Sequence, residues 1–343
     1  MKRINKLLII MFMLLFAITE VFASGGNRTG TGGAAQLLIP VGARGIAMGG
    51  SNIAAISGVD ALYWNPAGVA RMNSSFDAMF SHMNYIADIG VEYGAISAKL
   101  EGLGVFSLSI KSISVDEIAI TTTQNPDGTG ATYKPSFITA GISFSKALTD
   151  NIAIGVTGNL VSETLGDVSA SGFALDIGVL YNNLASVNGL SFGVAIKNLG
   201  PQMQFEGSGL VYQLDSDNLN RPPGLYRAEA APFELPSRFE IGFSYVPTFD
   251  EYNEVVLAGN YINNNFSSDE YKVGAEYGYN NRFFVRGGYV FAPQADDENF
   301  IYGFTAGAGI SYPVSGLDLK IDYAYRDVEY FDANHIFQVG IGF

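Results

Sequence analysis

Among its 343 residues the chain has no cysteine, only two histidines and a single tryptophan. Without cysteine it can form no disulfide, no thiolate metal site and no cysteine nucleophile. The two histidines, His82 and His335, are too few for a typical transition-metal site, and no serine motif accompanies them as a catalytic pair would require. We therefore predict structural roles for both, and no catalytic site, metal or cofactor.

Basic residues and long hydrophobic runs are also scarce. Lysine and arginine number 19 against 33 aspartates and glutamates, which gives a formal net charge of −14. Nucleic-acid phosphates need a basic face, so no nucleic-acid partner is expected. The main apolar run, residues 7–18, is shorter than the ~20 residues that a helix needs to span a membrane comfortably. Helical membrane insertion is therefore not expected.

The N-terminus has the features of a secretory signal. Lys2, Arg3 and Lys6 precede the apolar run, and the small residue Ala23 follows it at a position that suits signal peptidase. We predict that residues 1–23 form a cleaved signal peptide. An exported chain without disulfides must be stabilised by other means.

The abundant residues indicate a transmembrane β-barrel. The chain has 41 glycines, 24 phenylalanines and 19 tyrosines, and only 15% of its residues are charged. Its mean hydropathy is nevertheless positive, at +0.19. In a barrel wall, apolar residues alternate with small or polar ones, and aromatic girdles lie at both membrane interfaces. The alternative is a soluble antiparallel sandwich with one solvent-exposed face. Such a sandwich rarely places so many aromatic residues at strand ends.

A period of two supports the barrel. In LDLKIDYAYR (317–326) and HIFQVGIGF (335–343), apolar residues occupy every second position, and small, polar or charged residues occupy the others. The segments 173–181 and 271–277 alternate in the same way. Charges at the inward positions would either satisfy one another in a polar lumen or line a selective path for a ligand. The predicted lumen-facing charges are Asp176, Lys272, Glu276, Asp318, Lys320, Asp322 and Arg326.

Fourteen such runs follow one another along the chain. An even number brings both chain ends to the same side of a bacterial barrel, and several runs have the length of a tilted membrane-crossing strand. The predicted fold is all-β, a 14-stranded antiparallel transmembrane β-barrel over residues 75–343. The runs are approximately 75–85, 90–100, 104–115, 135–145, 152–162, 172–182, 190–198, 238–246, 254–263, 270–278, 282–291, 300–311, 316–326 and 334–343.

Short and long connections alternate between these runs. Compact ones, such as 101–104 and 313–316, have turn-like sequences. The two longest, about 116–134 and 199–237, both follow odd-numbered runs. Bacterial barrels have short periplasmic turns and longer outer loops. We therefore predict an outer-membrane location with periplasmic termini and extracellular long loops.

Residues 24–74 precede the barrel and are rich in small side chains, as in GARGIAMGGSNIAAISGVDALYWNPAGVARM (42–72). Small residues allow close packing against a lumen, and glycines permit turns that other residues disfavour. A nucleotide-binding loop is not indicated, because GARGIAMGG does not follow G-x-G-x-x-G and no Lys-Ser/Thr comes after it. We predict that this segment forms a hatch inside the barrel. Its motif is Trp64, Asn65, Pro66, Ala67 and Gly68.

Three stretches resemble a known family. GARGIAMGG followed by DALYWNPAGVA is similar to the N-terminal signature of FadL-like outer-membrane barrels, and within them to the PorV/PorQ family of the type IX secretion system. VAIKNLGPQM (194–203) and the C-terminal DYAYRDVEYFDANHIFQVGIGF agree with that family. The resemblance implies a barrel with an N-terminal hatch and no catalytic site. It further implies a carrier, surrounded by outer-membrane lipid, that takes cargo with a C-terminal signal domain from a translocon to a sortase-like surface protein.

The long connection 199–237 mixes aromatic residues with charges. Loops of this length are usually functional or disordered, and its aromatics favour a structured lid or a docking surface for a protein partner. The alternative function is a FadL-like channel for hydrophobic small molecules, with a hydrophobic ligand in the lumen. The candidate cargo or lid residues are Phe205, Tyr212, Leu225, Tyr226 and Phe233.

Overall fold

A computed structural model describes residues 32–214, 224–247, 250–295 and 300–343, so the predicted signal peptide lies outside the described residues. Fourteen antiparallel strands form one closed barrel, which confirms the predicted fold. The ring closes where β1 (Phe76–Asn84) pairs with β19 (Asn334–Gly342). The other wall strands are β2 (Gly90–Leu100), β3 (Gly104–Ser114), β6 (Ser136–Ala147), β7 (Ile152–Leu165), β8 (Val168–Tyr181), β9 (Leu190–Leu199), β13 (Arg238–Tyr245), β14 (Asn253–Asn264), β15 (Glu270–Tyr279), β16 (Phe283–Phe291), β17 (Tyr302–Val314) and β18 (Leu317–Val328).

The two faces of the wall differ as the period of two requires. On β19, Phe337 and Val339 are 54% and 45% exposed, whereas Gln338 between them is 2% exposed. The outward positions of the other strands are likewise mainly apolar or aromatic. The inward positions are small or polar, or apolar where the lumen segment packs against the wall. Such a wall buries its apolar face in lipid and keeps its polar face toward the lumen.

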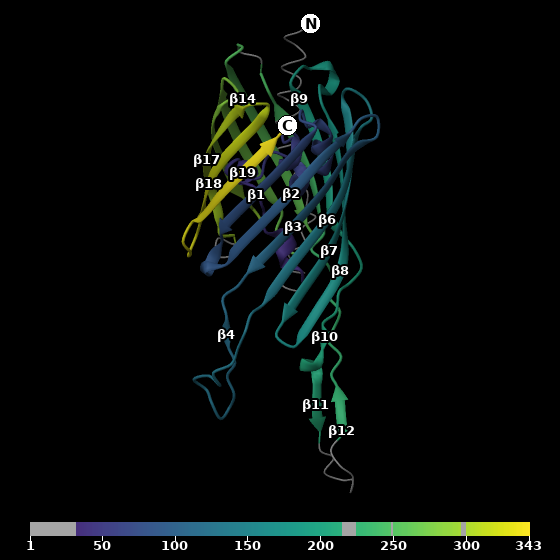
Figure 1. Cartoon of the computed structure of the whole chain (residues 1–343), viewed down its shortest axis with the longest axis vertical. Helices are drawn as coiled ribbons and strands as arrows, with labels where there is room; N and C mark the ends of the chain where they lie inside the picture. The colour runs from purple at the N-terminus through teal and green to yellow at the C-terminus, as the bar shows by residue number, and fades with distance from the viewer. Residues whose placement is uncertain (1–31, 215–223, 248–249, 296–299) are drawn as a thin grey trace.

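Strands β7 and β8 are longer than the sequence pattern predicts. The pattern places their facing ends at 162 and 172, whereas the ladder continues to Leu165 and Val168. Gly166 makes the tight turn between them with a φ of 60°, a value that glycine adopts readily. Small and polar side chains in 163–171 weaken the apolar alternation although the backbone pairing persists. The two strands therefore extend this side of the barrel (Figure 1).

The chain before β1 lies inside the barrel, and we call residues 32–74 the lumen segment. It is built of short helices, and no helix among the described residues is long and apolar enough to cross a membrane. Wall glycines allow its close approach, because a Cβ on Gly274 or Gly288 would lie 2.4 or 2.3 Å from backbone atoms of Met48. The helices are η2 (Ala35–Leu38), α2 (Ala43–Ala47), η3 (Gly58–Asp60), α3 (Ala61–Trp64) and η4 (Pro66–Arg71).

The two ends of the barrel are unlike. At one end Phe76 and the C-terminal Phe343 stack with ring centroids 5.2 Å apart. From the other, which we call the long-loop end, two hairpins project (Figure 1). One pairs β4 (Ile118–Ala119) with β5 (Thr132–Tyr133). The other pairs β11 (Val211–Leu214) with β12 (Gly224–Arg227), and follows β10 (Glu206–Gly207) and η7 (Ser208–Leu210).

Candidate functional site

The WNPAG motif forms a compact support within the lumen. The Asn65 side chain is fully buried, and its Nδ2 donates to the carbonyl oxygens of Ile53, at 2.9 Å, and Val179, at 3.2 Å. Its Oδ1 accepts from the Ala67 amide at 3.1 Å and so caps η4, in which Pro66 occupies the first turn. Asn65 therefore stands between α3 and η4, and its side chain caps η4 and joins the segment to the wall.

The facing wall is shaped to receive this motif. A Cβ on Gly155 would lie 2.3 Å from the carbonyl carbon of Pro66. Ser145 Oγ donates to the Pro66 carbonyl oxygen at 2.7 Å. Gly68 is required within the segment itself, because a Cβ there would lie 2.4 Å from the Ile56 carbonyl oxygen. Asn65 and Pro66 thus form hydrogen bonds with strands β6 and β8, and Gly68 leaves room for the backbone of the segment itself.

A charged network fixes the opposite side of the lumen segment. Arg44 of α2 donates two hydrogen bonds to Glu276 of β15, at 3.0 and 2.8 Å. Glu276 also pairs with Arg286 of β16, whose Nη1 lies 2.5 Å from Asp322 Oδ1 on β18. Glu276 raises the pKa of Arg44, which holds the guanidinium firmly in its charged form. Gln338 of β19 adds a neutral link by accepting from the Ala43 amide at 2.7 Å.

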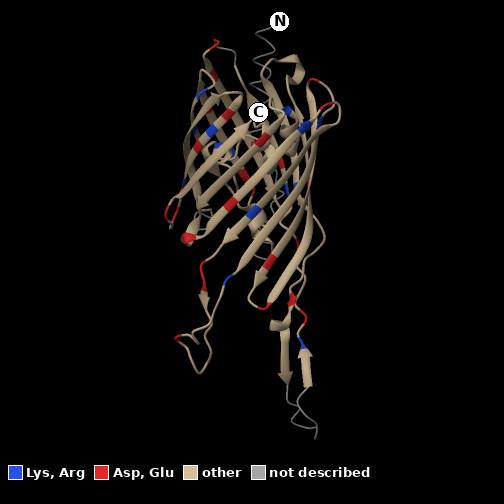
Figure 2. Ribbon diagram, viewed as in Figure 1, with Lys and Arg blue, Asp and Glu red and all other residues tan. Residues whose placement is uncertain are grey.

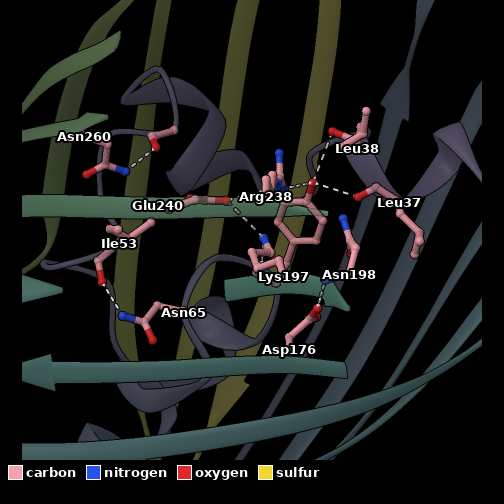
Figure 3. A network of polar contacts seen from close by, with 12 residues as sticks. Leu37, Leu38, Ile53, Asn65, Asp176, Lys197, Asn198, Arg238, Glu240 and Asn260 are labelled. Carbon is pink, nitrogen blue, oxygen red and sulfur yellow. Dashed lines mark hydrogen bonds and ion pairs between the residues drawn. The ribbon is translucent and has the colours of Figure 1, made fainter. Parts of the chain in front are cut away.

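A second polar network surrounds Tyr63, which precedes the motif tryptophan. Figure 3 shows its members Lys197, Arg238 and Glu240. The Tyr63 ring lies 3.9 Å from Lys197 Nζ and 5.0 Å from Lys111 Nζ. Its hydroxyl accepts from Arg238 Nη2 at 3.0 Å, and burial raises its pKa. Glu240 lies 3.0 Å from Arg238 Nε and 3.8 Å from Lys197 Nζ, so one carboxylate is shared by two cations.

The seven predicted lumen charges lie in different parts of the barrel. Figure 2 shows that charged residues are scattered over its strands and loops. Glu276 and Asp322 belong to the network of Arg44. Asp176 is buried beside the Tyr63 network and accepts from the Asn198 amide at 2.7 Å. Lys272 pairs with Glu270 at 2.9 Å. Arg326 donates to Asn334 Oδ1 from Nε at 2.9 Å and from Nη2 at 2.6 Å. Asp318 and Lys320 form a half-exposed pair near the C-terminal end, with 3.6 Å between Asp318 Oδ2 and Lys320 Nζ.

A cavity of about 740 Å³ lies between the lumen segment and the wall at the long-loop end. Ser267 and Phe300, which belong to connections at that end, line its mouth, and Tyr63 and Trp64 line it inside the lumen. Its volume is typical of sites for small ligands. Apolar residues of β3, β6 and β7 form one side together with the buried Glu163 of β7, and charged residues of β13, β15 and β18 form the other.

The five candidate residues of 199–237 do not form one surface. Phe205 and Phe233 are half-buried, with ring centroids 5.5 Å apart, and pack on a cluster with Ala34 and Leu37 of the lumen segment. Tyr212, Leu225 and Tyr226 lie on the β11–β12 hairpin and are 53%, 77% and 45% exposed. The first pair therefore supports the barrel mouth. Tyr212 and Tyr226 are paired across the hairpin and share one exposed face, whereas Leu225 pairs with Gln213 and lies on the other face.

Several residues of these networks were not identified from the sequence. Lys111 and Lys197 are lone charges at inward positions of apolar strands, and Glu240 shares the inward face of β13 with Arg238, so the same alternation could have found them. Tyr63 and Arg44 had no such signal, because short helices in a lumen have no regular period. Sequence reasoning identified the motif beside Tyr63 but not its charged partners.

The two histidines lie on the outward face of the wall. His82 Nδ1 lies 2.6 Å from Glu92 Oε1, and His335 Nδ1 lies 2.8 Å from the Tyr323 hydroxyl. Among the described residues, no group of three or more His, Cys, Asp or Glu side chains could hold a metal ion.

Comparison with known proteins identifies both a family and a fold. The family model described as "Type IX secretion system protein PorV" matches residues 22–220, more than half of the chain. No curated protein matches the sequence. Among solved structures, the TodX deltaS2S3 mutant monoaromatic hydrocarbon channel is 14% identical, with a TM-score of 0.54, over 88% of this chain and 97% of that one.

Two further solved barrels are similar. The Pseudomonas putida toluene transporter TodX is 14% identical over 88% of this chain and 96% of its own, with a TM-score of 0.53. A Pseudomonas aeruginosa FadL homologue is 10% identical over 88% and 98%, with a TM-score of 0.50. At this identity the likeness concerns the fold, which is that of the FadL-like barrels.

Proposed function

The chain belongs to the PorV family of type IX secretion system proteins, and from that premise we propose that this outer-membrane barrel carries exported proteins to the cell surface. It would hold cargo that bears a C-terminal signal domain, receive it at a translocon and present it to a sortase-like surface protein. The C-terminal end of the barrel would face the periplasm and the long-loop end the outside. No catalytic step is required of this chain.

The observation that carries the proposal is the exposed aromatic pair Tyr212 and Tyr226 on one face of a projecting hairpin, with Leu225 exposed on its other face. Exposed aromatic residues on a well-supported element are typical anchors for a protein partner. The support is provided by Phe205 and Phe233, which pack against the barrel mouth. A hairpin can also pair its free edge with an extended segment of a partner.

The filled lumen favours a carrier over a protein-conducting pore. The lumen segment is attached to β15 and β16 through Arg44 and to β6 to β8 through Asn65 and Pro66. Both attachments would have to break before an unfolded chain could pass through the barrel. Cargo is therefore better placed on the outside of the long-loop end than within the wall.

The proposal is tested by replacing Tyr212, Leu225 and Tyr226 together by alanine. Truncating one hot-spot residue typically costs ~2 kcal/mol, about thirtyfold in affinity. The variant should form a normal barrel but leave cargo unattached in the periplasm. A matched control replaces Leu103, Leu148 and Tyr252, which are equally exposed at the opposite end, and should attach cargo normally. Normal attachment in the hairpin variant would refute the docking role.

A second function, a channel for hydrophobic small molecules, is favoured by the apolar side of the cavity and by the fold. The solved neighbours are titled as a toluene transporter and a monoaromatic hydrocarbon channel. A deletion strain distinguishes the two functions. Lost uptake of toluene with intact cargo attachment would support the channel, and lost attachment with unchanged uptake would support the carrier.

A further inference from the structure

Strands β7 and β8 are longer than a membrane crossing requires. Each has 14 residues, whereas a tilted strand crosses the hydrocarbon with ~10. From the C-terminal end of the barrel as far as Leu160 and Phe173, the outward positions are apolar, aromatic or glycine, and these two side chains are 65% and 45% exposed. The outward residues beyond them are all polar, namely Ser162, Thr164, Ser169 and Ser171. The lipid-facing band of both strands therefore ends before the strands do.

The inner face of the same strand ends changes in the opposite direction. Within the band, the buried Asp176 faces the lumen, whereas beyond it Val161 and Ala170 belong to a buried apolar cluster with residues of the connection that follows β9. Glu163, which pairs with Ala170, is a buried charge on this face. A polar outer face over an apolar core is the arrangement of a sheet in water. We call residues 161–172 the projecting wall.

The projecting wall holds the base of the β11–β12 hairpin. β10 pairs with it at Gly207 and Val168, and the Gly209 amide donates to the Asp167 carbonyl oxygen at 3.3 Å. Gly207 allows this approach, because a Cβ there would lie 2.1 Å from the Asp167 carbonyl oxygen. Figure 1 shows β10 beside the end of β8, with β11 and β12 beyond it. The hairpin therefore extends from the wall and not from a free loop.

Backbone hydrogen bonds join the two arms of the hairpin from the barrel outward. Met203 and Phe233 exchange two of them, at 2.9 and 2.8 Å. The Ala228 amide then donates to the Leu210 carbonyl oxygen at 2.8 Å, and β11 and β12 pair directly after it. A two-stranded hairpin alone is marginally stable in water. These attachments therefore give it a fixed direction.

We propose that the projecting wall stands outside the bilayer and is the rigid base of the hairpin. Because the hairpin begins beyond this base, its face with Tyr212 and Tyr226 lies clear of the membrane. Such a surface fits a water-soluble domain and not a chain embedded in the bilayer. The inference rests on the proposed carrier function only in taking the hairpin as the docking element.

The first test locates the wall relative to the lipid. Bimane is attached to cysteines at Ser162 and Ser171 in barrels held in lipid nanodiscs, and the controls are Leu160 and Phe173, two residues away on the same face. Aqueous iodide should quench the serine positions severalfold more strongly than the controls, and brominated acyl chains should do the reverse. Equal quenching of Ser162 and Leu160 by brominated chains would place the wall in lipid and overturn the inference.

The second test measures whether the base is rigid. Spin labels on cysteines at Ser171 and Gln213, both exposed, should give one narrow distance distribution by double electron–electron resonance. Gly207→Val should broaden it and reduce cargo attachment, although the docking side chains remain. Gly130→Val is the control, because that glycine also has a positive φ but its Cβ would have no heavy atom within 4 Å.

A broad distance distribution in the unchanged barrel would refute the rigid base. The inference and the docking role fail separately. Normal cargo attachment in the hairpin alanine variant would refute the docking role and leave the quenching and distance results valid. Conversely, quenching of Ser162 by brominated chains would refute the projecting wall without affecting the docking role.

Discussion

Gly178 of β8 lies directly against Asn65 of the lumen segment, so that a Cβ on Gly178 would be 2.1 Å from Asn65 Oδ1. The two residues are far apart in the sequence, and the identity of each one accounts for the identity of the other. The wall needs a glycine there because the segment needs a buried asparagine that caps η4 and reaches the Val179 carbonyl oxygen. The packing of the lumen segment is therefore specified by the wall as well as by the motif.

The first prediction is that Gly178→Ala destabilises the barrel by about 1–3 kcal/mol, the usual cost of overpacking. The added methyl group would displace Asn65 and disturb its hydrogen bonds. The free energy of unfolding, from urea titration in lipid vesicles, measures the change. Gly94→Ala is the control, because its Cβ would meet only Ile110 Cγ2, at an ordinary 3.7 Å. Equal stability of the two variants would contradict this account.

The second prediction concerns the motif asparagine itself. Asn65→Ala removes a cap and takes the Asn65 donor away from the carbonyl oxygens of Ile53 and Val179, so we expect a loss of ~2 kcal/mol or more. Asn65→Asp restores the cap acceptor but not the donor, and should not recover stability. Protease sensitivity of the lumen segment and the unfolding free energy both report the effect. Asn125→Ala, at an exposed loop position, should change neither.

The third prediction concerns the charged network of α2. Glu276→Gln leaves Arg44 and Arg286 without their shared carboxylate, so its cost should approach the ~3–5 kcal/mol of a broken buried pair. Arg44→Gln should cost less, since Glu276 still pairs with Arg286. The double variant should be more stable than the sum of the single changes predicts. Strict additivity of the changes in unfolding free energy would exclude coupling between Arg44 and Glu276.

The same variants should also show higher ion conductance in planar bilayers, because they lose the attachment of α2 to the wall.

The wall was predictable from the sequence because lipid imposes a period of two on every strand. The exceptions have physical causes: the facing ends of β7 and β8 carry small and polar residues, which hide the alternation. The interior of the lumen was less predictable. Arg44 and Glu276 are 232 positions apart, and no local pattern pairs them. The separation of Phe233 from Tyr226 was equally unpredictable, since both lie in one connection without a period.

The last prediction fixes the orientation, on which the carrier proposal depends. The two hairpins project from the end opposite Phe343, so cysteines at Asn125 and Glu229 should react with a membrane-impermeant maleimide on intact cells. Cysteines at Asn188 and Asn280, in short connections at the other end, should react only after lysis. All four positions are exposed, and the native chain has no cysteine to give background labelling. The reverse pattern would place the hairpins in the periplasm. It would then be impossible for Tyr212 and Tyr226 to hold cargo at the cell surface.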